Sequence, residues 1–352
     1  MKTPFADHSS GISRRRFLKA AAITTMAAAS PAYVRAQDKS GTRAIILGEG
    51  AHSYECIHDW GELPSSIKYG NTHGVCQDSQ GRIYIKHTVG KGSEKDDAIV
   101  VFDESGKFIT SWGAEFKGGA HGLHINREGK EEFFYLADQK RHLMKKTTLD
   151  GKEVFTLFFP EESGLYNNGD EYHPTNVATA PNGDFYVSDG YGKSWIHQYT
   201  SAGKYIRSFG GPGKERGQTS CSHGLMVDTR GKEPVLVVAD RANRRLQYFT
   251  LDGRHISFVK DELRAPCHFH QRDGELLIPD LESRVTIFDK NNKLIVHLGD
   301  GTTYNGIRDK PREAFTPGKF IAPHSAYYDH DGNIFVVEWV EVGRVTKLRH
   351  VA

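Results

Sequence analysis

The sequence predicts an all-β protein, a six-bladed β-propeller built from four-stranded antiparallel blades. Three observations support this fold class. One segment recurs six times along the 352 residues, at intervals of 45 to 56 residues. Within each copy the apolar residues recur with a period near two, which is typical of strands. Most copies also carry a Gly- or Asn-containing pair between two apolar stretches, which favours a hairpin. Four short strands repeated at this period indicate propeller blades.

Each copy begins with a histidine, and a short strand and a turn containing Gly or Asp follow it. A second, apolar strand then ends on an acid in five copies, at Asp138, Asp189, Asp240, Asp280 and Glu338. Because this acid repeats, we expect it to serve the architecture, with the aspartates accepting hydrogen bonds between blades. The six histidines that open the copies are His73, His121, His173, His223, His268 and His324.

The sixth copy ends at its third strand, residues 345–350, and no fourth strand follows. Upstream of the first copy, residues 54–60 resemble the fourth strand of the first blade at residues 107–112. We therefore expect an N-terminal strand to complete the last blade and close the ring, which removes exposed sheet edges. The predicted division is a signal segment at 1–36, a linker at 37–52 and a propeller at 53–352.

The N-terminal segment is basic. Residues 1–36 hold six Lys or Arg and one acid, with an Arg-rich stretch at 13–19, a mild apolar run at 20–30 and a small-x-small site at 34–36. This pattern resembles a bacterial twin-arginine export signal, and a basic amphipathic arm is the alternative. It predicts a periplasmic or secreted protein that the twin-arginine machinery exports. The apolar run is shorter than the roughly 20 residues of a membrane span, so we expect no stable membrane span in the mature protein.

The remaining residues carry 40 basic and 43 acidic side chains. This balance removes the electrostatic argument for a nucleic-acid partner. The four cysteines, Cys56, Cys76, Cys221 and Cys267, show no CxxC spacing, which excludes a zinc ribbon or a redox motif of that type. Their disulfide state stays open.

The histidines form the candidate site. The first strand of each blade lines the channel of a propeller, so a residue beside that strand recurs around one mouth. Alternate blades are related by roughly 120°, so His121, His223 and His324 can converge on one ion. His73, His173 and His268 offer a second triangle, and symmetry does not choose between the two. Three neutral imidazoles with an open fourth position are typical of catalytic zinc. The alternative is that each histidine caps its own strand or bonds the neighbouring blade.

The repeat pattern resembles the NHL family of six-bladed propellers over essentially the whole mature chain. Four of the blades also resemble the lyase domain of peptidyl-glycine α-amidating enzymes. The residues that carry this second resemblance are His173–Ala178, Phe185–Tyr191, Ser222–Leu225, Val238–Gln247, Ala120–Leu123 and Ala322–Ser325.

This resemblance implies a zinc-dependent carbon–nitrogen lyase with zinc ligands at His121, His223 and His324. It also implies a catalytic tyrosine at Tyr191 and an active-site arginine at Arg241. The family reaction splits a peptidyl-α-hydroxyglycine into an amide and glyoxylate, so the expected partner is a peptide C-terminus or a small molecule. The sequence departs from the family at Gly192, where a family disulfide is absent, and at two further positions. Thr88 stands at the place of a first-blade arginine, and Ser325 leaves the family's calcium site without its acid.

Alternatives remain for these residues. Tyr191 can cover the channel rim, and Arg241 can bond the backbone of the preceding blade. The second functional hypothesis is a non-catalytic NHL propeller that binds a peptide, glycan or protein partner. A calcium-dependent lactonase needs Asp, Glu and Asn ligands, which histidine-rich positions fit poorly. Residues 299–319, polar and rich in Gly and Pro, predict an exposed loop near the histidine mouth.

Overall fold

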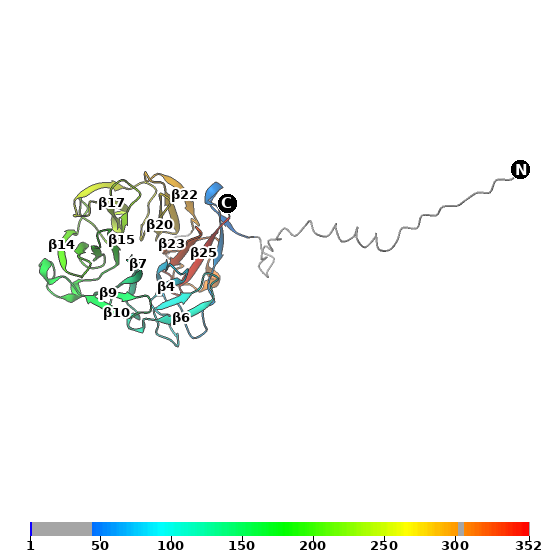
Figure 1. Ribbon diagram of the computed structural model, residues 1–352, viewed down its shortest axis with the longest axis horizontal. Coiled ribbons are helices and arrows are strands. Elements are labelled where there is room, and N and C mark those ends of the chain that lie inside the picture. The colour runs from blue at the N-terminus through cyan, green and yellow to red at the C-terminus, as the bar shows by residue number, and fades with distance from the viewer. Residues whose placement is uncertain (2–43, 302–305, 352) are drawn as a thin grey trace. The chain divides into compact units, whose positions relative to one another are not determined.

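The computed structural model describes Met1 and residues 44–301 and 306–351, so residues 2–36 of the predicted export signal lie outside the described residues. The described chain forms 25 strands in six antiparallel sheets. Figure 1 shows these sheets arranged as a ring around a common centre. The predicted six-bladed, all-β architecture is confirmed. The helices among the described residues are all short 3-10 helices, and none has the length and apolarity that crossing a membrane requires.

Consecutive strands pair within each of the first five blades, and each blade begins with the strand nearest the channel. Blade 1 contains β3 (Thr72–Gln77), β4 (Ile83–His87), β5 (Ile99–Phe102) and β6 (Phe108–Trp112). Blade 2 contains β7 (Ala120–Glu128), β8 (Glu131–Asp138), β9 (Leu143–Thr148) and β10 (Glu153–Leu157). Blade 3 contains β11 (Asn176–Thr179), β12 (Phe185–Ser188), β13 (Trp195–Tyr199) and β14 (Tyr205–Gly210). Blade 4 contains β15 (Ser222–Asp228), β16 (Val235–Asp240), β17 (Arg245–Phe249) and β18 (His255–Val259). Blade 5 contains β19 (His270–Arg272), β20 (Glu275–Asp280), β21 (Arg284–Phe288) and β22 (Leu294–Leu298). The 3-10 helices are Gly50–His52, Ala114–Phe116, Glu161–Ser163, Gly169–Glu171, Arg241–Asn243 and Arg312–Ala314.

The last blade closes the ring as expected. It contains β23 (Pro323–Tyr328), β24 (Ile334–Glu338) and β25 (Arg344–His350), and its fourth strand is β2 (Tyr54–His58) from the other end of the propeller. Tyr54 pairs with His350, and His58 pairs with Thr346. A fifth strand, β1 (Ile46–Leu47), pairs with β2, so this sheet begins inside the segment predicted as a linker.

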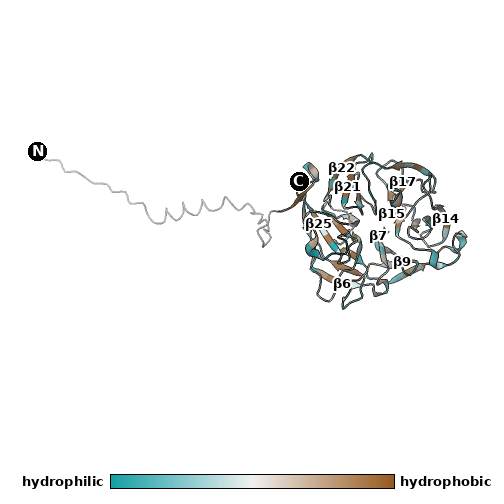
Figure 2. Cartoon of the chain, turned by 180° about the vertical axis from the view of Figure 1, so that it is seen from behind, coloured by the Kyte–Doolittle hydropathy of each residue, from teal (hydrophilic) through white to brown (hydrophobic). Residues whose placement is uncertain are grey.

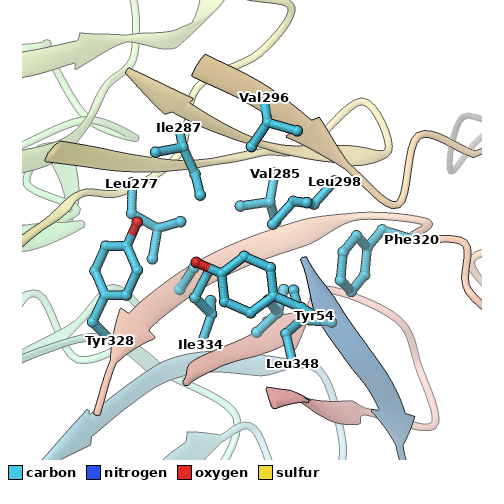
Figure 3. Packing of buried hydrophobic residues seen from close by; sticks show 12 residues of the cluster. Tyr54, Leu277, Val285, Ile287, Val296, Leu298, Phe320, Tyr328, Ile334 and Leu348 are labelled. Carbon is cyan, nitrogen blue, oxygen red and sulfur yellow. The ribbon is translucent and has the colours of Figure 1, made fainter. Parts of the chain in front are cut away.

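Apolar contacts between blades hold the ring together. Figure 3 shows one such cluster, in which Tyr54 of the closing strand packs beside Leu298 and Phe320. Tyr54 is 3% exposed and Leu348 of the neighbouring strand is fully buried. Burying a large apolar side chain contributes about 1.5–3 kcal/mol, so the closing strand is held by packing as well as by its backbone ladder. Figure 2 shows hydrophobic residues along strands such as β21 and β25.

The acids that end the second strands act within their own blades, so the prediction that the aspartates bridge between blades is wrong. The carboxylate of Asp240 accepts from the backbone N–H of Ser220 at 2.7 Å, just before the first strand of blade 4. Glu338 accepts from the backbone N–H of Ile321 at 2.7 Å in the same way. In four of the five blades, at Asp189, Asp240, Asp280 and Glu338, the acid therefore ties the chain that enters the first strand to the end of the second strand. Asp138 instead accepts from the backbone N–H groups of Lys140 and Arg141, just after its own strand. The chain that enters the first strand carries the histidines, so the four acids help to position the channel mouth.

Candidate metal centre

Four of the six histidines lie in irregularities of the first strands. The register between the first two strands shifts at His73 in blade 1, at His121 in blade 2, at His223 in blade 4 and at His324 in blade 6. A β-bulge places an extra residue opposite its partner strand and re-aims side chains. In these four blades the bulged residue is the histidine, and its side chain joins a buried cluster in the channel.

The alternate-blade histidines predicted as ligands form a nearly equilateral group. The ring centroids of His121 and His223 lie 4.9 Å apart, those of His121 and His324 lie 4.8 Å apart, and those of His223 and His324 lie 4.7 Å apart. All three side chains are at most 4% exposed. The structure therefore brings these three residues together at the channel axis.

Hydrogen bonds fix the tautomer of each of the three rings. Nδ1 of His121 lies 2.7 Å from the carbonyl oxygen of Thr175, and Nδ1 of His223 lies 2.8 Å from that of Cys267. Nδ1 of His324 lies 2.9 Å from the carbonyl oxygen of His73. A carbonyl only accepts, so each Nδ1 carries a proton and each neutral ring keeps its lone pair on Nε2. Histidines that bind a metal through one ring nitrogen typically donate the N–H of the other ring nitrogen to a carbonyl or carboxylate in this way.

Two glycines that sequence reasoning missed allow these hydrogen bonds. A Cβ at Gly122 would lie 2.5 Å from the carbonyl oxygen of Thr175, and a Cβ at Gly224 would lie 2.3 Å from that of Cys267. These are the same carbonyls that accept from His121 and His223. Glycine therefore lets the next blade approach the imidazole. The His-Gly pairs at 121–122 and 223–224 were the available sequence signal.

His73 also belongs to the cluster. The ligand nitrogens of His73, His121 and His324 all lie within 4.8 Å of one another, the single group of three possible metal-binding side chains found among the described residues. Nδ1 of His73 lies 3.3 Å from Nε2 of His324. Because Nε2 of His324 is the lone-pair nitrogen, His73 donates this bond. His73 is thus a fourth imidazole beside the triangle.

The second predicted triangle does not form. His173 lies before β11 and binds the carbonyl of Gln139 through Nδ1 at 2.9 Å, and its ring packs 4.5 Å from that of His142. His268 lies before β19, and its Nδ1 is 3.4 Å from the hydroxyl of Ser325. The paired strands of blade 3 show no register shift. In blade 5 the pairing shifts by one residue between Pro266, opposite Asp280, and His270, opposite Leu277. His173 lies before the first paired residue of its blade, and in blade 5 the residue that directly follows Pro266 is Cys267, so both histidines leave the position that the other four share.

Tyr191 and Arg241 meet beside the triangle. The hydroxyl of Tyr191 lies 3.0 Å from Nε2 of His223 and 3.3 Å from Nε2 of His121. Nη2 of Arg241 donates to the same hydroxyl at 3.2 Å, and Nη1 contacts the sulfur of Cys267 at 3.7 Å. Tyr191 is 39% exposed, so the group reaches the surface of the mouth. The Arg241 side chain thus contacts two other side chains. This differs from the alternative role, in which it would bind the backbone of the preceding blade.

Burial sets the charges of these groups. It lowers the pKa of His121 to about 3 and holds the pKa values of His223 and His324 well below their usual range. The imidazoles are therefore neutral at neutral pH, as metal ligands must be. Desolvation of its hydroxyl among these side chains raises the pKa of Tyr191 to about 12, and the charge of Arg241 partly opposes that increase.

The donor set decides which metals fit. Three neutral imidazole nitrogens suit zinc and other borderline transition metals. Calcium takes oxygen ligands, chiefly carboxylates and carbonyls. The metal-ligand group found among the described residues contains no carboxylate, and Ser325 contacts an imidazole, His268, so the site gives no support to calcium.

Comparisons with curated proteins point to one group of enzymes. The chain is 27% identical over 328 residues to peptidyl-glycine alpha-amidating monooxygenase B of Xenopus laevis, covering 83% of this chain and 35% of that protein. It is 24% identical over 336 residues to peptidyl-alpha-hydroxyglycine alpha-amidating lyase 1 of Drosophila melanogaster, covering 81% of this chain and 58% of that protein. The chain thus spans about a third of the length of the monooxygenase. No protein-family profile matches the chain.

Solved structures confirm the fold. A streptogramin B lyase structure matches with a TM-score of 0.58 and 14% identity, covering 84% of this chain and 97% of that one. At this identity the match concerns architecture alone. Together with the curated relatives, it shows that the chain is a six-bladed β-propeller that resembles the peptidyl-α-hydroxyglycine α-amidating lyases.

Proposed function

We propose that this protein is a metal-dependent lyase that cleaves the C–N bond of an N-acyl-α-hydroxyglycine, with zinc held by His121, His223 and His324. One observation carries the proposal. Three buried imidazoles from alternate blades commit Nδ1 to a neighbouring blade and keep the lone pair of Nε2 for a ligand bond. The likeness to proteins named as amidating lyases supports the choice of reaction.

The proposed reaction needs no oxidant or reductant. The bond between the amide nitrogen and the hydroxyl-bearing carbon breaks, and its electron pair stays on nitrogen. The hydroxyl loses its proton as its carbon becomes the aldehyde of glyoxylate. The nitrogen gains a proton, and the acyl group leaves as a primary amide. The enzyme must therefore remove one proton and stabilise the charge that develops on oxygen.

Tyr191 is the residue placed to move that proton. Its hydroxyl sits between two of the imidazoles and accepts from Arg241. A base at this position must be a tyrosinate, and the guanidinium of Arg241 favours that charged form. Zinc, when bound, supplies a Lewis acid that polarises an oxygen. Arg241 thus acts by positioning and activating Tyr191.

Metal content of the purified protein tests the ligand set. We expect about one zinc per chain in the wild type and less than a tenth of that in His121→Ala, His223→Ala and His324→Ala. His173→Ala is the matched control, because it removes an imidazole from the same repeat position outside the cluster. His73→Ala distinguishes this ligand set from the alternative set of His73, His121 and His324. Loss of metal in His73→Ala with retention in His223→Ala would overturn the alternate-blade assignment.

Turnover of N-benzoyl-α-hydroxyglycine, followed as glyoxylate release, tests the activity. We expect Tyr191→Phe to lower kcat by about 10²- to 10⁴-fold without changing metal content. A wild-type protein that holds zinc but releases no glyoxylate above the uncatalysed rate would refute the lyase. The non-catalytic propeller, with a peptide, glycan or protein ligand, would then be the function to pursue.

We also propose that the mature protein is periplasmic or secreted. The Arg-rich stretch at 13–19 and the site at 34–36 support this proposal. Replacing Arg14, Arg15 and Arg16 by lysine should retain the protein in the cytoplasm, as fractionation of the producing cells would show. Export that is indifferent to this change would contradict the twin-arginine route.

A further inference from the structure

Arg308 lies at the channel mouth without an acidic partner. It belongs to the segment between β22 and β23, and its guanidinium carbon lies 3.8 Å from the centre of the Trp339 ring. Nη1 of Arg308 donates to the side-chain oxygen of Asn71 at 3.3 Å. Among the described residues these are its recorded side-chain contacts, and no carboxylate pairs with it.

Both contacts place Arg308 on the histidine side of the propeller. Trp339 directly follows Glu338, as Arg241 directly follows Asp240 in blade 4. The backbone N–H of Trp339 donates to the carbonyl of Ala322, two residues before His324. Asn71 lies two residues before His73 in blade 1. Arg308 therefore rests on the rims of blades 6 and 1, whereas Arg241 projects from blade 4.

The segment that carries Arg308 is anchored. Ile307 packs against a buried apolar cluster that includes Leu281 and Phe315. Cys267, whose sulfur contacts Arg241, belongs to the same cluster. The backbone N–H of Glu341 donates to the carbonyl of Arg308 at 3.1 Å. These contacts fix the backbone before and after Arg308. A ligand that binds there therefore does not have to order this segment first.

The two arginines at the mouth differ in which of their N–H donors already have partners. Arg241 directs both terminal nitrogens at neighbours, Tyr191 and Cys267. Arg308 stacks one face on Trp339 and uses Nη1 in its single recorded side-chain hydrogen bond. A guanidinium carries five N–H donors in a planar fork that matches a carboxylate. Stacking leaves the edge of that fork available, and the side chain is half-buried, which strengthens charged hydrogen bonds.

We propose that Arg308 binds the carboxylate of the ligand at the channel mouth and so selects acylglycine-type anions over their uncharged analogues. This inference rests on the proposed function, because it assigns the carboxylate of that substrate. Trp339 holds the guanidinium in place, and Arg241 remains the partner of Tyr191. Arg308 is a binding residue here and takes no part in proton transfer.

Calorimetric titration with N-benzoylglycine, which cannot react, tests the proposal without turnover. We expect the wild type to bind this acid at least tenfold more tightly than N-benzoylglycinamide. Arg308→Gln should weaken binding of the acid by roughly 10- to 100-fold and leave the amide unchanged. Lys310→Gln is the matched control, because it removes a positive charge from the same segment. Trp339→Leu should weaken binding of the acid in the same direction.

The outcomes separate this proposal from the lyase. Arg308-dependent binding of the acid without any glyoxylate release would refute the lyase and support the anion site. Glyoxylate release with equal KM in wild type and Arg308→Gln would support the lyase and overturn the role of Arg308. Under both proposals, Arg308→Gln raises KM for the hydroxylated substrate by more than tenfold and keeps the zinc content of the wild type.

Discussion

Lys86 offers the sharpest test of how this channel is built. It lies on β4 of blade 1 and is fully buried. Its ammonium donates to the carbonyls of Gly122 and Ala137, each at 2.9 Å, and lies 5.0 Å from the centre of the Phe116 ring. No ion pair to a carboxylate is recorded for it among the described residues. Burial lowers its pKa from 10.5 to about 7, although the charges of Asp138 and Glu115 partly oppose the shift.

The direction of the pH effect follows from this lowered pKa. Between about pH 7 and pH 10.5 the unfolded chain holds the Lys86 proton and the folded chain has released it. Stability therefore rises with pH wherever the unfolded state binds more protons. Below pH 7 both states hold the proton and the cost of burial is fully present. With these two pKa values, this lysine raises the free energy of unfolding by about 2 kcal/mol between pH 7 and pH 9.

Lys86→Met removes the titrating group and keeps a similar apolar volume. We expect the difference in unfolding free energy between wild type and variant to shift by about 2 kcal/mol in favour of the wild type from pH 7 to pH 9. Urea denaturation with a chelator present measures this difference without metal binding. Lys130→Met, at an exposed lysine, should leave the wild-type slope unchanged. A wild-type-minus-variant difference that stays constant across this range would refute the reasoning.

Two further predictions concern the blade architecture and the close approach at the histidines. Asp240→Ala should lower the free energy of unfolding in urea by about 3–5 kcal/mol, because it leaves the buried Arg245 without its partner. Glu282→Ala, which breaks an exposed ion pair, should lower it by less than about 1 kcal/mol. Equal losses of stability would contradict the role of Asp240 in holding the blade together. Gly122→Ala should cost about 1–3 kcal/mol and reduce zinc content, because its Cβ would press on the Thr175 carbonyl. Gly231→Ala, whose Cβ would meet nothing closer than 3.7 Å, is the control, and unchanged metal binding in Gly122→Ala would count against the carbonyl contact.

Local patterns in the sequence were enough to predict the blades. Strand β17, for example, covers the same residues, 245–249, that alternation and the neighbouring hairpin pair indicate. The closing strand was also predictable, since residues 54–60 repeat the pattern of a fourth strand while the last copy lacks one. These features depend on side-chain alternation and turn chemistry, which neighbouring residues determine. The partners of the strand-end acids were predicted wrongly, because a buried acid reveals its need for donors but does not identify which chain segment supplies them.

By itself, the sequence determined that this chain forms a six-bladed ring with a histidine at the start of each blade. It left two triangles of histidines equivalent, because both satisfy the same symmetry. The resemblance to the amidating lyases favoured one of them, and the tertiary structure supplied the physical distinction. A histidine occupies the shifted position of the first strand in blades 1, 2, 4 and 6, whereas Cys267 takes that place in blade 5 and the paired strands of blade 3 show no shift. A bulge depends on the fit between two strands and the next blade, so its position is a property of packing. The contact between Arg308 and Trp339 arises in the same way, since 31 residues of sequence separate two side chains that the ring brings together.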